Sequence, residues 1–130
     1  MKFIRMPIWE HKSTALFVER ISAGIEVLGG KWTVRILCAM RDKPARLSEL
    51  RRLFPKASKK ALTASLRSLE TAGLIERRDL SNSVLHVEYR VSDTVREPLL
   101  SLISHLSDWG EAYEKISLGG GQDDASSDLL

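Results

Sequence analysis

The spacing of apolar residues changes from helical to alternating at Gly73, and this change strongly constrains the fold. Before it, in residues 58–72, leucines recur every three or four positions, as on one face of a helix. After it, apolar and polar residues alternate through LIERRDL and VLHVEYRV, as in strands packed on one side. The turn-forming SNS between the two runs predicts a hairpin. A helix ended by a glycine is therefore expected to lead directly into two β-strands.

Three further helices are predicted before residue 58. Apolar spacing indicates a first helix over residues 14–28, ended by Gly29 and Gly30, and we expect the left-handed backbone of a helix end at this glycine pair. The run WTVRILCAM predicts a short second helix over residues 32–40. Ser48 is the expected N-terminal cap of a short third helix, which Pro55 stops.

The basic helix over residues 58–72 is expected to have two different faces. Ser58 is a candidate N-terminal cap, and Gly73 the stop. Leu62, Leu66 and Leu69 fall on one stripe, and the opposite stripe is small, cationic and capable of hydrogen bonding. In the second strand, one face of the hairpin is expected to carry Leu85, Val87, Tyr89 and Val91.

A long apolar stripe after the hairpin predicts a last helix that starts near Thr94 and continues to residue 116. We therefore expect an N-terminal arm over residues 1–13, one domain over residues 14–116 and a disordered tail over residues 117–130. The fold class is mainly α with a small β-hairpin, an α+β arrangement. Two helices joined by a tight turn and followed by a hairpin predict a winged helix-turn-helix.

The charge of the chain is distributed unevenly. Residues 41–78 hold eleven basic and four acidic residues, a local charge of +7, whereas residues 79–130 hold three basic and ten acidic residues, a local charge of −7. The positive charge falls on the two helices and the hairpin strand that suit a nucleic acid: a major groove admits one helix, and flanking cations can meet phosphates. These features together predict binding to double-stranded DNA.

Several other functions are disfavoured. The stretch GGKWT resembles part of a phosphate-binding loop, but Gly30 intervenes before Lys31, and Trp32 stands where that loop needs a hydroxyl. No nucleophile constellation or metal-ligand spacing stands out, so we expect no enzyme, cofactor or metal site. The absence of a long apolar run, of a signal peptide and of a second cysteine favours the cytoplasm.

The chain also resembles a known family, the HxlR-type branch of MarR-like transcription regulators. The resemblance covers roughly residues 19–113 and rests on IEVLGGKWTVRIL, LSELRRLFPKASKKALTASLRSLETAGLIERR, VEYRVS and DWGEAY in this order. It implies a bacterial homodimer that binds a palindromic operator sequence-specifically, through helix 58–72 and a wing over residues 77–88. An effector is not indicated.

The resemblance and the positions of the residues together suggest individual roles. Lys60, Thr63 and Ala64 are placed to contact bases, and Ser58, Lys59 and Arg67 to contact phosphates. The turn around Asn82 is expected near the minor groove, flanked by Arg77, Arg78 and His86. Arg46 and Ser48 are further candidate phosphate contacts. The dimer interface is expected to contain Leu16, Phe17, Ile21, Leu102, Ile103, Leu106, Trp109 and Tyr113.

The chain departs from the family pattern at three places. Glu19 stands where many members carry a redox-sensing cysteine. The wing reads SNSVL before His86 instead of prolines and an arginine, which would make the minor-groove contact weaker or responsive to pH. The usual turn after the hairpin is replaced by residues 92–95, so the entry into the last helix is expected to differ.

Alternatives remain at this stage. The hairpin could be an interaction edge of a winged helix that binds a protein and no DNA, or the domain could bind RNA, or the basic run could be only a solvated face. Cys38 is expected to be a small buried hydrophobe, with a sensor thiol as the alternative. Trp32, Trp109 and Tyr113 are expected to serve packing or an interface, with a ligand pocket as the alternative.

Overall fold

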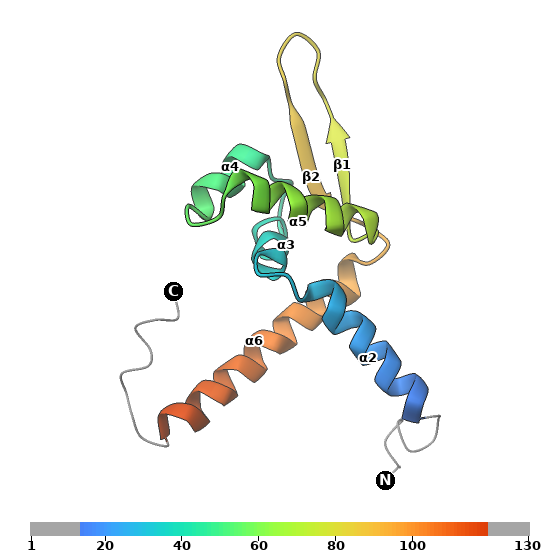
Figure 1. Ribbon diagram of the computed structural model, residues 1–130, viewed down its shortest axis with the longest axis vertical. Coiled ribbons are helices and arrows are strands. Elements are labelled where there is room, and N and C mark those ends of the chain that lie inside the picture. The colour runs from blue at the N-terminus through green and yellow to red at the C-terminus, as the bar shows by residue number, and fades with distance from the viewer. Residues whose placement is uncertain (1–13, 120–130) are drawn as a thin grey trace. The chain divides into compact units, whose positions relative to one another are not determined.

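The computed structural model describes residues 14–119. The helices and strands are α2 (Thr14–Leu28), α3 (Thr33–Ala39), α4 (Leu47–Leu53), α5 (Lys59–Thr71), β1 (Ile75–Asp79), β2 (Val87–Val91) and α6 (Arg96–Gly119). The chain divides after Ser92 into two compact units, of which the first contains α2 to β2 and the second contains α6 (Figure 1). The predicted fold class, helices with one two-stranded antiparallel hairpin, is confirmed.

The core of the first unit lies where α3, α4 and β1 contact α5. The three leucines of the α5 stripe, Leu62, Leu66 and Leu69, are buried as predicted. The other fully buried apolar side chains of this unit come from α3 and its C-terminal cap, from α4 and from both strands: Ile36, Leu37, Met40, Leu50, Ile75 and Val91. This core fixes the orientation of α5, so the opposite side of the helix faces water.

Local rules define both ends of α5. At its start, the Oγ of Ser58 accepts a hydrogen bond from the backbone N–H of Ala61 at 3.0 Å. At its end, Gly73 has a φ of +84°, and the N–H groups of Gly73 and Leu74 donate to the carbonyls of Glu70 and Leu69, both at 3.0 Å. This pair of bonds satisfies carbonyls that the helix end leaves unpaired. The cap and the stop predicted for this helix are confirmed.

Replacing Gly73 by alanine is expected to lower the free energy of unfolding by about 1–2 kcal/mol, because a residue with a Cβ is strained at positive φ. A Cβ at this position would meet no atom within 4 Å, so the cost comes from the backbone and not from crowding. Urea denaturation measures the difference. Gly73→Asn is the matched control: asparagine tolerates this conformation, so it should cost clearly less, and equal losses for both variants would contradict this account.

The hairpin is shorter than the alternating pattern predicted. β1 pairs antiparallel with β2 from Ile75 opposite Val91 to Asp79 opposite Val87. The prediction that Val84 and Leu85 belong to the second strand was wrong, because both lie in the turn and are exposed. A further bridge joins Ala45, just before α4, to Tyr89 of β2 through two backbone hydrogen bonds of 2.9 Å. The hairpin is thereby attached to the start of α4.

The two glycines after α2 act differently from the prediction. The helix ends at Leu28, as expected, but neither Gly29 nor Gly30 has a positive φ. Gly30 is instead required by space, because a Cβ on it would lie 2.5 Å from the Oγ1 of the buried Thr33. Between α2 and α3 the backbone therefore passes close to the Thr33 side chain at Gly30, and it does not form the left-handed turn that was predicted.

The cap of α4 also differs from the prediction. Arg46, with extended backbone (φ −102°, ψ 157°), occupies the N-cap position that was predicted for Ser48, and Ser48 lies inside the first turn. The N–H of Arg46 donates to Oε1 of Glu49 at 2.8 Å. Glu49, three residues into the helix, thus accepts the bond that fixes its start.

The second unit consists of α6, of which Leu99 is the buried residue. This helix begins at Arg96, two residues after the predicted start, and it continues to Gly119, so it includes residues 117–119 of the predicted tail. The rest of that tail, residues 120–130, and the predicted arm, residues 1–13, lie outside the described residues. The exposed large apolar side chains of α6 are Leu102, Leu106, Trp109, Tyr113, Ile116 and Leu118.

Candidate nucleic-acid interface

The solvent-facing side of α5 carries the residues that were predicted to contact DNA. Lys60, Ala64 and Arg67 are exposed there, and Thr63 is half-buried beside them. Ser58 and Lys59 are exposed at the N-terminal end. Within residues 14–119 no acidic side chain forms a salt bridge with Lys59, Lys60 or Arg67. The face therefore presents cations whose charges are not neutralised by a neighbouring carboxylate.

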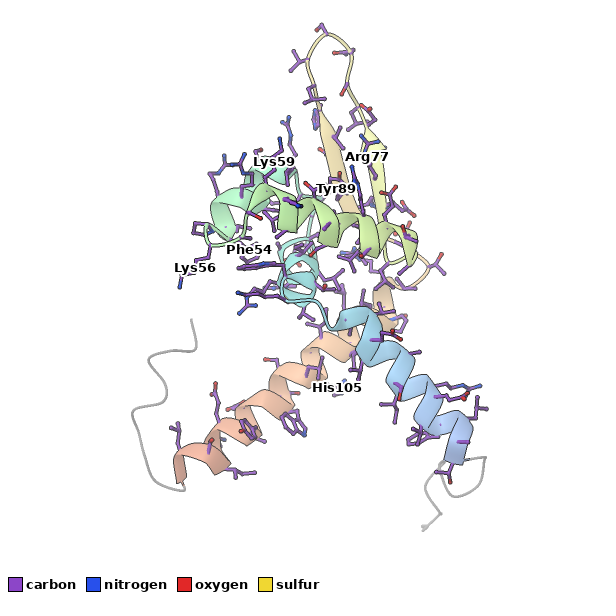
Figure 2. All side chains as sticks on the ribbon, in the orientation of Figure 1. Phe54, Lys56, Lys59, Arg77, Tyr89 and His105 are labelled. Atoms are coloured by element: carbon purple, nitrogen blue, oxygen red, sulfur yellow. The ribbon has the colours of Figure 1, made fainter. Side chains whose placement is uncertain are left out.

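A basic hollow of about 400 Å³ lies between the starts of α4 and α5 and one face of the hairpin. We call it the wing hollow. Figure 2 labels Lys59, Arg77 and Tyr89 in this region. Four cations and no carboxylate line it, together with a serine and apolar side chains: Arg46, Arg51, Lys59, Arg77, Ser48, Leu47, Leu85, Val87 and Tyr89. A concave surface lined by cations concentrates positive electrostatic potential, which favours an anionic ligand.

Strand register explains why Arg77 lies on the side of the hollow. Arg77 pairs with Tyr89 and so shares a face with it, because directly opposed residues of an antiparallel pair point to the same side. The next pair along, Arg78 and Glu88, lies on the other face, together with Arg90 and Glu76, which form a salt bridge of 3.2 Å. The charges on that other face thus balance. On the side of the hollow Arg77 lies opposite Tyr89, and the carboxylate on this side is Asp79, two residues along β1 and outside the lining of the hollow, whose pKa Arg77 helps to lower after the two Ser81 hydrogen bonds.

Arg46 joins the hairpin to α4. Its Nη2 donates a hydrogen bond to the backbone carbonyl of Leu85 at 3.1 Å, and the side chain is half-buried. The residue was predicted as a phosphate contact, and it still lines the wing hollow. Its hydrogen bond adds a second role, because it fixes the base of the turn relative to α4.

Hydrogen bonds across the turn hold residues 80–86 together. The Leu80 N–H donates to the His86 carbonyl at 2.7 Å, and the His86 N–H donates to Oγ of Ser81 at 2.8 Å. The Ser81 hydroxyl and N–H hold the pKa of the Asp79 carboxyl below its ordinary value; the N–H bond to Oδ1 is 3.0 Å long. The turn has a defined shape that presents Asn82 to solvent at its tip.

His86 is engaged within the hairpin. Its Nε2 lies 2.9 Å from Oε2 of Glu88, and both side chains are partly buried. The structure thus places the imidazole, just before β2, beside a carboxylate of β2 on the face with Arg78. A contact of His86 with DNA stays a prediction.

The structure brings some predicted residues together and leaves others apart. Arg46, Ser48, Lys59 and Arg77 line the wing hollow. The other residues predicted to contact DNA through the helix, Lys60, Thr63, Ala64 and Arg67, lie along α5, and Arg78 and His86 lie on the other face of the hairpin. Sequence reasoning did not single out Arg51, which also lines the hollow. Its spacing of three residues from Ser48 on the same short helix is the signal that places both side chains on one side.

The residues considered for other functions occupy structural positions. Lys31 and Arg35 each lie 5.3 Å from the ring centre of Trp32, and this ring lies 5.9 Å from that of Phe54, so the lysine of GGKWT contacts an aromatic ring. Cys38 is half-buried, less enclosed than the buried hydrophobe that was expected. No group of three or more histidine, cysteine or acidic residues within residues 14–119 is arranged to hold a metal ion.

A short helix, a tight turn, a second helix with an exposed basic face and a hairpin attached to both define a winged helix-turn-helix domain. Residues 27–117 match the family of HxlR-like helix-turn-helix proteins, and the chain belongs to this family. YdzF of Bacillus subtilis, an HTH-type transcriptional regulator, is 42% identical over 89 residues, which are 68% of this chain and 81% of YdzF. The protein is accordingly a transcriptional regulator of the helix-turn-helix type.

Solved structures agree with this assignment. The crystal structure of the HTH-type regulator ytcD has a TM-score of 0.68 and 37% sequence identity, and the match covers 73% of this chain and 96% of that chain. The redox regulator HypR in its reduced form has a TM-score of 0.71 and 27% identity, and covers 77% of this chain and 98% of that chain. Separately, no helix within residues 14–119 is both long and apolar enough to cross a membrane.

Proposed function

We propose that the protein regulates transcription as a homodimer that binds a palindromic operator sequence-specifically. In each subunit α5 enters a major groove, and the hairpin reaches the adjacent minor groove. The observation that carries the proposal is the continuity of one positive surface: the exposed cations of α5 adjoin the wing hollow, whose lining contains no carboxylate. A DNA backbone requires such a surface, and a protein partner does not.

The residues of this surface fall into two groups, those placed to contact bases and those placed to contact phosphates. Lys60, Thr63 and Ala64 lie where the helix would face base edges, and the small size of Ala64 allows close approach. The remaining contacts are to phosphates, and they position the domain without reading sequence. These phosphate contacts are Ser58, Lys59 and Arg67 of α5 and its cap, Arg46, Ser48 and Arg51 at α4, and Arg77 on the hairpin. Along the wing, Arg78, Asn82 and His86 would make further contacts with DNA.

The dimer would be formed by α2 and α6. The apolar residues Leu102, Leu106, Trp109, Tyr113 and Ile116 recur at alternating intervals of four and three, the spacing of a coiled-coil seam. All five are exposed in the single chain, and Trp109 and Tyr113 stack at 5.5 Å. On α2, Leu16 and Ile21 are exposed and Phe17 is half-buried, as is Ile103 on α6. Patches of this kind mark association surfaces, and a two-fold axis would pair both helices with their copies.

Arg77→Ala is expected to weaken operator binding at least tenfold and to reduce the slope of log K against log salt concentration by about two, since each subunit would lose one phosphate contact. Arg78→Ala is the matched control: it changes the neighbouring residue by the same charge, on the face where Glu88 lies opposite. Its effect on the slope should be smaller. Fluorescence anisotropy over a salt titration measures both quantities, and equal slopes for the two variants would refute the orientation of the hairpin.

An electrophoretic shift with random duplex DNA at low salt tests the proposed function itself. A basic recognition helix binds non-specifically at micromolar protein, so retardation is expected. Its absence would favour the alternative of a winged helix that binds only a protein partner. Stronger retardation of single-stranded or hairpin RNA than of duplex DNA would favour an RNA-binding winged helix instead.

A further inference from the structure

The turn of the hairpin exposes three aliphatic side chains. Leu80, Val84 and Leu85 are 44%, 70% and 75% exposed, and we call them the wing tip. Further along the chain, in β2, Val87 and Tyr89 are half-buried. The hairpin extends beyond α4 and α5 (Figure 1), and Leu85 also lines the wing hollow beside residues of α4. Keeping three large aliphatic groups in water is unfavourable, and the association of this turn with another surface would recover that free energy.

The tip is displayed by a turn with fixed hydrogen bonds. The bonds from Leu80 to His86 and from His86 to Ser81 close it internally. From outside, the Arg46 guanidinium holds the carbonyl of Leu85 at 3.1 Å. The aliphatic side chains are therefore held exposed on a turn of fixed shape. Such preorganisation lowers the entropic cost of binding.

The charges around the tip indicate the kind of surface it meets. The wing hollow, which Leu85 itself lines, contributes four cations. Two carboxylates of the hairpin have partners: Asp79 accepts a hydrogen bond from the N–H of Ser81 and interacts with Arg77, and Glu88 contacts His86. An aliphatic tip beside a hollow that is lined by four cations and no carboxylate is complementary to an anionic surface that also offers apolar groups. A DNA minor groove has this composition, because the C–H groups of its sugars line the walls between two rows of phosphates.

From this arrangement we infer that the wing tip inserts its aliphatic side chains into the minor groove next to the α5 site, where Val84 and Leu85 pack against sugars and base edges. The inference rests on the proposed function and adds a contact that is apolar, not cationic. Proteins that bind this groove insert leucine and similar side chains between base steps and bend the duplex as they do so. The tip would then contribute affinity that is insensitive to salt, in contrast to Arg77.

The double substitution Val84→Ser with Leu85→Ser tests the inference in the full-length protein. We expect duplex affinity to fall about tenfold or more with an unchanged salt slope, because no charge is removed. Hydroxyl-radical protection should be lost in the minor groove beside each half-site and retained elsewhere. Leu53→Ser is the matched control: it removes another aliphatic side chain, 59% exposed on α4 and outside the wing hollow, and should leave both readouts unchanged.

The outcomes separate this inference from the proposed function. If the wild type binds duplex DNA and the double variant has the same affinity and footprint, the wing-tip inference is overturned and the proposed function stands. The same affinity combined with loss of regulation in a purified transcription reaction would also overturn it, in favour of a protein partner at the tip. A wild type that binds no duplex at all would overturn both.

Discussion

Leu106→Glu is expected to leave the protein monomeric and to weaken binding to a palindromic duplex by about two orders of magnitude or more. Leu106 lies in the middle of the exposed seam of α6, between Leu102 and Trp109. In the proposed dimer each added carboxylate would be buried against apolar groups of the second copy, close to its own symmetry mate. Loss of the dimer removes the gain from binding two linked half-sites, which commonly amounts to factors of 10²–10⁴.

Light scattering would measure the mass, and fluorescence anisotropy would measure the affinity for the duplex. Ser104→Glu is the matched control, because it adds the same charge to the same helix at an exposed position about 200° around the helix axis from Leu102. It should remain dimeric and bind within about twofold of the wild type. A dimeric Leu106→Glu protein with normal affinity would show that α6 does not form the interface.

Ala64→Glu is expected to reduce duplex binding by about two orders of magnitude without unfolding the domain. The position is exposed on the outer side of α5, opposite the buried leucines. A glutamate there would approach phosphates and base edges with a charge of the same sign as DNA, in the place where close contact is required. Glutamate is a good helix former, so the thermal midpoint should stay within a few degrees of the wild-type value.

The measurement for Ala64→Glu combines an electrophoretic shift with thermal unfolding. Ser104→Glu again controls for the change in net charge. A loss of binding accompanied by a large drop in thermal midpoint would indicate damage to the fold. Normal binding with an intact fold would exclude this face of α5 from the interface.

The features that sequence reasoning predicted correctly are those governed by nearest neighbours along the chain. Leu62, Leu66 and Leu69 follow the helical period, Ser58 can cap its own helix, and Gly73 supplies the positive φ of a helix end. These rules act over three or four residues. The limits and the buried face of α5, and hence its exposed basic face, could therefore be read from the sequence.

The features that sequence reasoning missed depend on contacts between distant segments. The hydrogen bond from Arg46 to Leu85 joins residues 39 positions apart, and the bridge between Ala45 and Tyr89 joins residues 44 apart. No local sequence pattern predicts either contact. The wing hollow is likewise formed by distant segments, because Arg51 of α4 and Arg77 of β1 both line it. The placement of Arg77 and Arg78 on opposite faces depends on the register of the hairpin.

In the proposed complex, two copies of the chain present the exposed basic face of α5 to one duplex symmetrically. Repeated selection of bound sequences from a pool of random duplexes tests it most directly, since specificity and symmetry are read together. We expect an enriched inverted repeat whose half-site centres lie about one helical turn apart, roughly 10 base pairs. Enrichment of a single asymmetric site, or of no sequence at all, would contradict it.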